Sequence, residues 1–402
     1  MEPGHQQQRR RLRERVGELH TTSSARAGGP RRSRRPPRKR HTRKLLGGVV
    51  IGAAIVVVIG ATQTQAVKPV QAVATASRLR ARHVAHAVRP LDIQGPLPGA
   101  LLIADRGNDR MLLVDPQHRV LWRFPTARDL ARGTRVYFND DGFVEPGGKA
   151  IVANEEESHT IISVNIKTHA VTHMYGTPGV RGSGPNELNT PDDAYVLPDG
   201  TLTVADAYNC RILFIRAHRI VRQLGRTGAC YHDPPTAFGA VNGDTPLKDG
   251  GVLVSEIPGS WIDNIAHNGR LRWAVRAPVA YPSDPQMLSG GRILLAGYTN
   301  PGTVLIMNRH GTVLWRYAPS AGWGALDHPS LAMMLPNGDI AVNDDFKDRV
   351  VIIDPTTNSI VWQYGHTGVP GTGPGYLNTP DGMDFVPLGP NRTPLWSLVH
   401  HP

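Results

Sequence analysis

Residues 200–215 read GTLTVADAYNCRILFI. A glycine opens this segment, an apolar run follows, and an acidic residue, Asp206, stands six positions after the glycine. A short polar loop then leads into a second apolar run, RILFI. Short runs rich in Val, Ile and Leu, bounded by Gly, Asp and Asn, predict adjacent strands that are buried on both faces.

This pattern occurs six times, at intervals of 41 to 52 residues. The turn glycines are Gly99, Gly148, Gly200, Gly250, Gly291 and Gly338, and the marker residues six positions later are Asp105, Asn154, Asp206, Glu256, Gly297 and Asp344. A third run follows in each unit, with a tryptophan in four of them: Trp122, Trp273, Trp315 and Trp362. Four short strands in a repeat of about 50 residues describe one blade of a β-propeller. We therefore predict an all-β, six-bladed propeller over residues 97–390.

The two ends of the propeller are predicted to share one blade. Residues 377–389, LNTPDGMDFVPLG, match residues 188–200, LNTPDDAYVLPDG, which supply the innermost strand of the third unit. The first unit lacks such a strand, and the C-terminal copy has no unit of its own. We expect the C-terminal copy to complete the first blade, so that strands from both ends close the ring.

The repeat units and the linkers between them resemble known propeller families. GTLTVADAYNCRILFI resembles an NHL repeat, and the linkers of residues 175–192 and 364–382 have the Gly-rich, Pro-terminated form of that family's interblade loops. The units with VLWRY and IVWQYG are similar to quinoprotein-like (PQQ-like) and arylsulfotransferase-like propellers. The resemblance covers about residues 95–390 and implies the fold. It does not imply one activity, because such propellers include scaffolds, binding proteins and enzymes.

The net charge of +12 is confined to one end of the chain. Residues 1–44 contain fifteen of the 45 Lys and Arg residues and three of the 33 acidic residues, so the other 358 residues carry 30 of each sign. A neutral propeller has no general attraction for phosphates, and we expect no nucleic-acid partner. The basic segment, rich in Arg and Pro and without apolar periodicity, is predicted to be a disordered cytoplasmic tail.

An uncharged stretch, LLGGVVIGAAIVVVIGATQTQAV, follows at residues 45–67. Its apolar centre, about 18 residues long, is at the lower end of what spans a bilayer. The basic flank predicts that the N-terminus is cytoplasmic. We expect a single-pass signal anchor in the cell membrane, then a juxtamembrane linker (68–96), an extracytoplasmic propeller and a C-terminal tail (391–402). The alternative is a signal peptide cleaved near Ala61 or residues 64–66, which would leave a secreted propeller.

Acidic residues recur where the innermost strands should begin, at the mouth of the central channel. Counting back from the turn glycines gives Asp141, Asp193 and Asp284, with Asp244 one position off and Asp381 on the closing strand. Converging like charges are costly unless a cation or shared protons offset them. Oxygen ligands of this kind suit Ca²⁺ or another hard divalent cation. The alternative is that each Asp caps the turn that enters its own strand.

The sequence offers one candidate catalytic residue. The sulfotransferase resemblance implies a catalytic histidine near the start of an innermost strand, and His328 is the candidate. The sequence has no nucleophile-and-base pair, Gly-rich phosphate loop or closely spaced His and Cys metal motif. We therefore expect a binding or interaction scaffold for a protein, a glycan or a small ligand. The alternative is a cation-dependent, lactonase-like hydrolase or lyase, or a sulfotransferase-like enzyme, with its site at the channel mouth.

Cys210 and Cys230 are the two cysteines of the chain. Cys210 begins a predicted strand, and the next strand returns the chain toward it near Leu224. A disulfide between them suits an extracytoplasmic compartment, and two free buried thiols are the alternative. Arg110, Arg211 and Arg349 share one position in three units, and we expect them to form blade-to-blade ion pairs with the marker acids.

Overall fold

The computed structural model describes residues 89–137 and 139–399. The predicted cytoplasmic tail and signal anchor lie outside this range. Among the described residues, no helix has the length and apolar character needed to cross a membrane.

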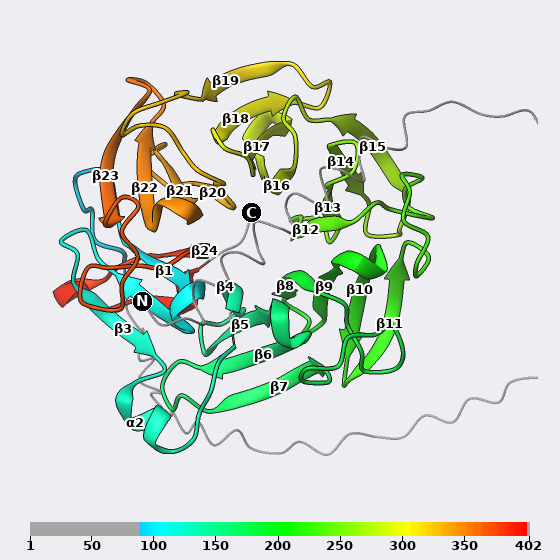
Figure 1. Cartoon of the computed structure of the whole chain (residues 1–402), viewed down its shortest axis with the longest axis horizontal. Coiled ribbons are helices and arrows are strands. Elements are labelled where there is room, and N and C mark those ends of the chain that lie inside the picture. Colours follow the sequence, from blue (N-terminus) through cyan, green and yellow to red (C-terminus); the bar gives the residue numbers. More distant parts are fainter. Residues whose placement is uncertain (1–88, 138, 400–402) are drawn as a thin grey trace, which may run out of the picture. The chain divides into compact units, whose positions relative to one another are not determined.

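Six four-stranded antiparallel sheets surround a central axis, which confirms the predicted six-bladed propeller (Figure 1). In each sheet the first strand lies nearest the axis. These inner strands are β4 (Asn139–Val144), β8 (Pro191–Val196), β12 (Val241–Pro246), β16 (Pro282–Leu288), β20 (Ala332–Met334) and β24 (Pro380–Val386).

The remaining strands of each blade run outward in chain order. The second strands are β1 (Ala100–Asp105), β5 (Ala150–Glu155), β9 (Leu202–Asp206), β13 (Val252–Glu256), β17 (Arg292–Gly297) and β21 (Ile340–Asp344). The third strands are β2 (Arg110–Val114), β6 (Thr160–Asn165), β10 (Arg211–Arg216), β14 (Trp261–Ile265), β18 (Thr303–Asn308) and β22 (Arg349–Asp354). The outer strands are β3 (Val120–Phe124), β7 (Val171–Gly176), β11 (Arg219–Leu224), β15 (Leu271–Arg276), β19 (Val313–Tyr317) and β23 (Ser359–Gly365).

Helical structure in the described range is limited to short segments. One α-helix, α2 (Ala127–Ala131), follows the first blade and begins with a capping box between Thr126 and Asp129. The 3₁₀ turns are η1 (Arg106–Asn108), η2 (Glu156–Ser158), η3 (Ala207–Asn209), η4 (Ser289–Gly291), η5 (Asp345–Lys347), η6 (Pro390–Arg392) and η7 (Trp396–Leu398).

Burial follows the position of a strand in its blade. Every residue of β1 and β2 is buried, whereas four of the five residues of the outer strand β3 are at least partly exposed. The second and third strands therefore read as continuous apolar runs because neighbouring blades cover both of their faces.

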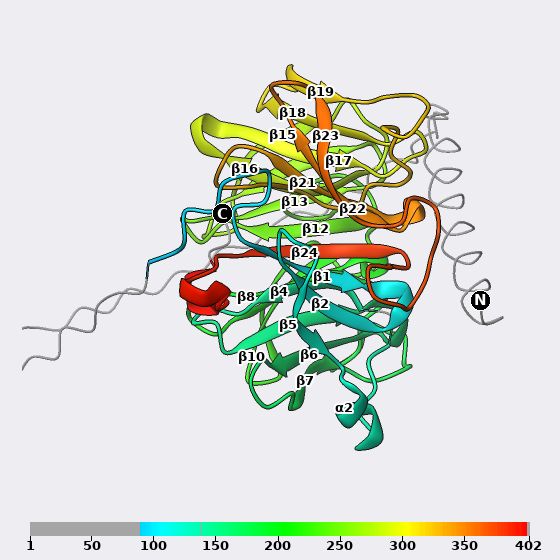
Figure 2. The same ribbon diagram turned by 90° about the vertical axis from the view of Figure 1, so that its left-hand side faces the viewer.

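The C-terminal strand closes the ring, as predicted. β24 pairs with β1, and the register places Leu101 opposite Phe385 and Ile103 opposite Met383. Figure 2 shows β24 beside β1. The chain continues past the propeller boundary predicted at residue 390, and Trp396 packs against Trp122 with ring centroids 5.8 Å apart.

The repeated arginines pair with the marker acids, but the prediction that these pairs join two blades is wrong. The Nε atoms of Arg110, Arg211 and Arg349 lie 2.5 to 2.7 Å from marker carboxylates of their own blades. The pairing is internal because the marker ends the second strand and the arginine begins the third, directly opposite it. The other guanidinium nitrogens reach neighbouring loops, as where Arg349 donates to the carbonyl oxygen of Trp323.

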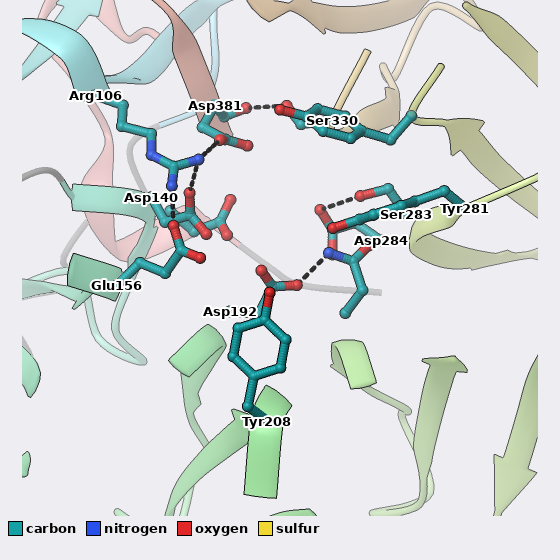
Figure 3. Close-up of a pocket in the computed structure, with 13 residues that line it drawn as sticks. Arg106, Asp140, Glu156, Asp192, Tyr208, Tyr281, Ser283, Asp284, Ser330 and Asp381 are labelled. Atoms are coloured by element: carbon teal, nitrogen blue, oxygen red, sulfur yellow. Dashed lines mark hydrogen bonds and ion pairs between the residues drawn. The ribbon is translucent and has the colours of Figure 1, made fainter. Parts of the chain in front are cut away.

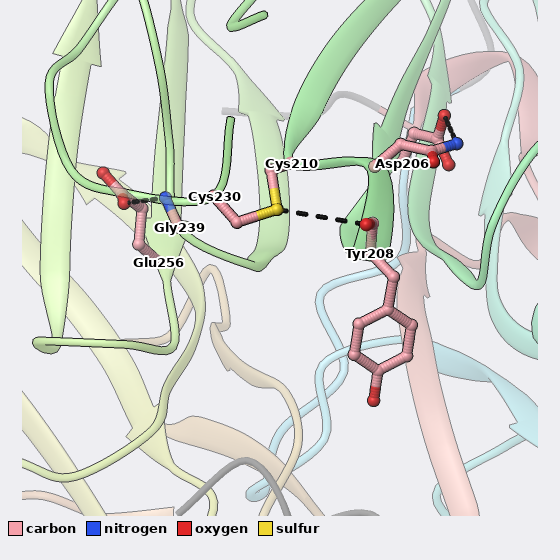
Figure 4. Close-up of a disulfide and its surroundings, with 7 residues drawn as sticks. Asp206, Tyr208, Cys210, Cys230, Gly239 and Glu256 are labelled. Atoms are coloured by element: carbon pink, nitrogen blue, oxygen red, sulfur yellow. Dashed lines mark hydrogen bonds between the residues drawn. A yellow bond between two sulfur atoms is a disulfide. The ribbon is translucent and has the colours of Figure 1, made fainter. Parts of the chain in front are cut away.

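The predicted disulfide is present. Cys210 and Cys230 are bonded, and the bridge ties the linker between the third and fourth blades to the end of η3 (Figure 4).

We expect the double substitution Cys210→Ser with Cys230→Ser to lower the free energy of unfolding by about 3 kcal/mol, because the unfolded chain loses a cross-link over roughly 20 residues. Denaturant unfolding of the oxidised protein measures the change. Reduction of the native protein should reproduce it, and reduction of the double variant should have no effect. Equal stability of the oxidised and reduced native protein would contradict a stabilising role.

Candidate functional site

A narrow cavity lies on the axis where the inner strands begin (Figure 3). Its volume is about 40 Å³, which is room for roughly three water molecules at 10–15 Å³ each. Five inner strands, and in the sixth blade a residue two positions before the inner strand, contribute polar groups: Asp140, Asp141, Asp192, Asn242, Ser283, Asp284, Ser330 and Asp381.

The turns after the second strands supply a further layer of the cavity wall. The residue that directly follows the second strand is Arg106, Glu156, Ala207, Ile257, Tyr298 or Asp345 in the successive blades. Three of these, Arg106, Glu156 and Tyr298, line the cavity, together with Tyr208 and Tyr281. This position therefore contributes to the cavity wall in three of the six blades.

Arg106 is the one cation among the described residues that line the cavity. Its side chain is 3% exposed, and its guanidinium forms ion pairs with Asp140 and Glu156 of the second blade and with Asp381 of its own blade. Figure 3 shows the guanidinium between these three carboxylates. Burial alone would lower the pKa of Arg106, but Asp140 and Asp381 raise it, so the guanidinium stays charged.

The structure brings three of the five predicted ring residues to the cavity. Asp141, Asp284 and Asp381 line it, whereas Asp193 and Asp244 are fully buried and do not. Their places are taken by Asp192 and Asn242.

Bulges at the start of the inner strands explain this difference. The pairing with the second strand shifts between Asn139 and Gly142, between Pro191 and Asp193, and between Val241 and Gly243. A bulge places two residues opposite one and changes which side chain points to a given face. Counting a fixed number of residues from the turn glycine therefore finds the right segment but not always the right residue.

Several carboxylate oxygens at the channel mouth have no hydrogen-bond partner. The buried oxygens without a hydrogen-bond partner are Asp141 Oδ1, Asp193 Oδ1, Asp284 Oδ1 and both carboxylate oxygens of Asp244. The alternative prediction, that each Asp caps the turn entering its own strand, leaves these oxygens unexplained. The packing is also close, because a Cβ at Gly382 would clash with Asp141 Oδ1.

Burial and mutual repulsion favour the protonated forms of these acids. Burial raises the pKa of Asp284, and the charges of Asp193 and Asp141 raise it further. Burial also raises the pKa of Asp141, again with Asp193 as the strongest neighbouring charge. For Asp193 itself, burial raises the pKa to about 7, although backbone hydrogen bonds from Asp244 and Ala194 oppose the shift.

His328 lies beside the cavity wall but does not line the cavity. Its Nδ1 is 2.6 Å from Asp327 Oδ1, and its ring packs edge-on against Tyr298 with centroids 5.0 Å apart. It therefore contacts a residue of the wall and not the enclosed space.

The carboxylates of the cavity do not form a compact chelating group. In the described part of the chain, the one group of three potential ligands whose ligand atoms all lie within 4.8 Å of one another is His232, Glu256 and Asp263, in and beside the fourth blade. The oxygen ligands at the channel mouth are therefore farther apart than those of this group. The sequence did not predict the group of His232, Glu256 and Asp263.

The sequence also did not predict four kinds of residue at the cavity: Arg106, Asp140, Asp192 and the tyrosines. One signal was available for Arg106, because comparing the residue after each second strand shows an arginine in one blade and acids in two others. Asp140 and Asp192 adjoin predicted residues, so their role depends on the bulges, which the sequence does not mark.

No protein-family model matches the chain, and a search of curated proteins gives no match. The resemblance to NHL-repeat and quinoprotein-like propellers therefore stays a prediction and does not assign the chain to a family.

The chain is similar to several solved structures at low sequence identity. A Bacteroides caccae protein of unknown function is 17% identical, with a TM-score of 0.49, and the match covers 71% of this chain and 97% of that one. A streptogramin B lyase is 15% identical, with a TM-score of 0.46 and coverage of 76% and 93%. A nidogen/laminin complex gives 12% identity, a TM-score of 0.49 and coverage of 71% and 97%. These similarities assign no activity to the chain.

The cavity acids predict how stability depends on pH. A carboxyl whose folded-state pKa is raised stabilises the fold below its unfolded pKa, and this stability is lost as the pH rises through the folded pKa. For Asp193 the window runs from about pH 4 to about pH 7. The loss is about 1.4 kcal/mol per pH unit for each proton released.

We therefore expect the melting temperature, measured without divalent cations, to fall between pH 5 and pH 8. Asp193→Asn should reduce the slope, whereas Asp199→Asn, at an exposed carboxylate paired with Arg216, should leave it unchanged. A melting temperature that rises over this range in the native protein would contradict the assignment.

Proposed function

We propose that this chain is a membrane-anchored, extracytoplasmic binding protein whose channel mouth takes a hydrated divalent cation. The observation that carries the proposal is the charge imbalance of a buried cavity. Six carboxylates among the described residues line it, those of Asp140, Asp141, Glu156, Asp192, Asp284 and Asp381, and one guanidinium opposes them. Either protons or a further cation must offset the excess, because uncompensated buried charge is strongly unfavourable.

The form of the cavity favours a hard cation that keeps part of its water shell. Its volume accommodates an ion with a few waters, and its carboxylates are too far apart to chelate a bare ion in threes. Ca²⁺ takes six to eight oxygen ligands, and Mg²⁺ is commonly held by one or two carboxylates through retained waters. The unpartnered oxygens of Asp141 and Asp284 are the first candidates for these contacts.

A bound cation would give the propeller a binding face. An ion held at the channel mouth leaves part of its coordination shell toward solvent, where a carboxylate or hydroxyl of a small ligand, a glycan or a protein can bind. Tyr208, Tyr281 and Tyr298 around the cavity add apolar surface and hydroxyl groups for such a ligand.

We expect Asp141→Asn with Asp284→Asn to weaken the binding of Ca²⁺ and Mg²⁺ at least tenfold, measured by calorimetry on the full chain at pH 7.5. The double variant should melt at a higher temperature than the native protein without cations, because each buried aspartate must either be charged near like charges or take up a proton on folding, and an amide does neither. It should also lose the increase in melting temperature that cations produce.

Asp199→Asn serves as the matched control and should bind cations as the native chain does. Absence of any cation effect on the native protein, or equal weakening by the control, would overturn the proposal.

A second candidate is an enzyme, a hydrolase or lyase in which the cation polarises the substrate. The raised pKa values of Asp141 and Asp284 favour it, because a carboxyl that is protonated near neutral pH can donate a proton in a reaction. Turnover of lactone or glycan substrates that requires the cation and is lost in Asp284→Asn would select the enzyme over the binding protein.

The proposed location has its own support and test. The disulfide is consistent with an oxidising compartment, and residues 45–67 have the composition of an anchor. We expect an alkaline phosphatase fused after residue 402 to be active and membrane-associated, and deletion of residues 45–67 to abolish both properties. An active fusion released into the medium would favour the cleaved signal peptide.

A further inference from the structure

The fourth blade departs from the ion pair that recurs in other blades. In the first, third and sixth blades, a marker acid at the end of the second strand faces an arginine at the start of the third. In the fourth blade the marker is Glu256, and the residue opposite it is Trp261. The fourth blade therefore keeps the buried acid and lacks the arginine.

A second acid lies on the same face, in a position that is apolar in every other blade. Asp263 stands two residues after Trp261, opposite Val254. The equivalent residues, defined by the same register, are Leu112, Ile162, Leu213, Leu305 and Val351. Asp263 is fully buried, and neither of its carboxylate oxygens has a hydrogen-bond partner. A carboxylate in a core position of this kind needs a cation or a shared proton to offset its burial.

His232 completes the group from the linker between the third and fourth blades. Its Nδ1 lies 2.7 Å from Glu256 Oε1 and 4.0 Å from Asp263 Oδ2. The imidazole ring is stacked on Trp261, with centroids 3.9 Å apart and the planes nearly parallel. The side chain is 23% exposed, so solvent reaches the cluster from this side.

The surroundings hold this arrangement in place. The other carboxylate oxygen of Glu256 accepts a hydrogen bond from the backbone N–H of Gly239, which orients the carboxylate (Figure 4). Two residues before His232, Cys230 is bonded to Cys210, so the linker is fixed to the third blade. Arg276 lies over the ring of Trp261, 4.8 Å from its centroid.

We propose that His232, Glu256 and Asp263 bind a divalent transition-metal ion of the Zn²⁺ class. One imidazole nitrogen and two carboxylates are ligands that Zn²⁺ accepts at about 2.0–2.2 Å, and three protein ligands leave a position for water. The three ligand atoms lie within 4.8 Å of one another, so an ion between them needs only small side-chain movements. The imidazole distinguishes this site from the channel mouth, where the predicted ligands are oxygens suited to a hard cation.

The competing explanation is a proton shared between Asp263 and Glu256, with no metal. The two explanations differ in what Asp263→Asn and Asp263→Leu do. If a metal binds, both substitutions remove a ligand and abolish the stabilisation that the metal provides. If a proton is shared, metal has little effect on any variant.

The test is a Zn²⁺ titration of the tag-free full chain against a chromophoric zinc indicator, in the Asp141→Asn, Asp284→Asn background so that the channel mouth contributes little. We expect one Zn²⁺ per chain, with affinity reduced at least tenfold by His232→Ala and by Asp263→Asn. Asp249→Asn and His267→Ala, at exposed residues of the same blade, are the matched controls and should bind Zn²⁺ unchanged.

Co²⁺ and melting temperature give independent readouts. Bound Co²⁺ should show a visible d–d absorption band that His232→Ala removes or shifts. Asp263→Leu, which introduces a residue found at this position in other blades, should melt no lower than the native protein without metal and should not respond to Zn²⁺. Zn²⁺ binding that is absent from the native cluster, or unaffected by Asp263→Asn, would overturn the proposal.

Discussion

The structure depends on closing a ring, because no blade can bury both of its faces alone. Each sheet is covered by two neighbours, and the first and last segments of the propeller can be neighbours only if they meet. The pairing of β24 with β1 achieves this by joining residues 100–105 to residues 380–386. One apolar cluster accordingly contains side chains from both ends of the propeller, such as Leu101 and Met383. The backbone pairing and this cluster support each other, since either would be exposed if the ring opened.

Closure also explains why acids gather on the axis. The inner strands converge there, so the first residues of six blades are brought together although they are far apart in sequence. One arginine from the first blade then forms ion pairs with three of the nearby acids, Asp140, Glu156 and Asp381, and offsets part of their charge. The fold brings the inner strands close together. The side chain at each repeat position then determines whether the surface at the axis is apolar, acidic or ion-paired.

The fold could be predicted from the sequence because it repeats. A turn glycine, a buried run and a marker acid occur often enough to define the blades, and the match of residues 377–389 with residues 188–200 was sufficient to predict the closing strand. The candidate site was predicted only in part, because bulges in the inner strands change which residue faces the axis. Asp141, Asp284 and Asp381 line the cavity, while Asp192 lines it in place of its neighbour Asp193. Contacts between blades, such as those of Arg106, could not be predicted, because they join residues that are far apart in the sequence and form no local motif.

Departures from the repeat indicate function more clearly than the repeat itself. The Asp–Arg pairs of three blades are structural, since each arginine satisfies a buried carboxylate and nearby loop carbonyls. In the fourth blade a tryptophan replaces the arginine, an aspartate replaces an aliphatic core residue, and a histidine from the linker approaches both acids. Loss of the arginine alone, or gain of the aspartate alone, would leave a buried charge without compensation. Together they produce a group with one imidazole and two carboxylates, so the three changes are best understood as one feature of this blade.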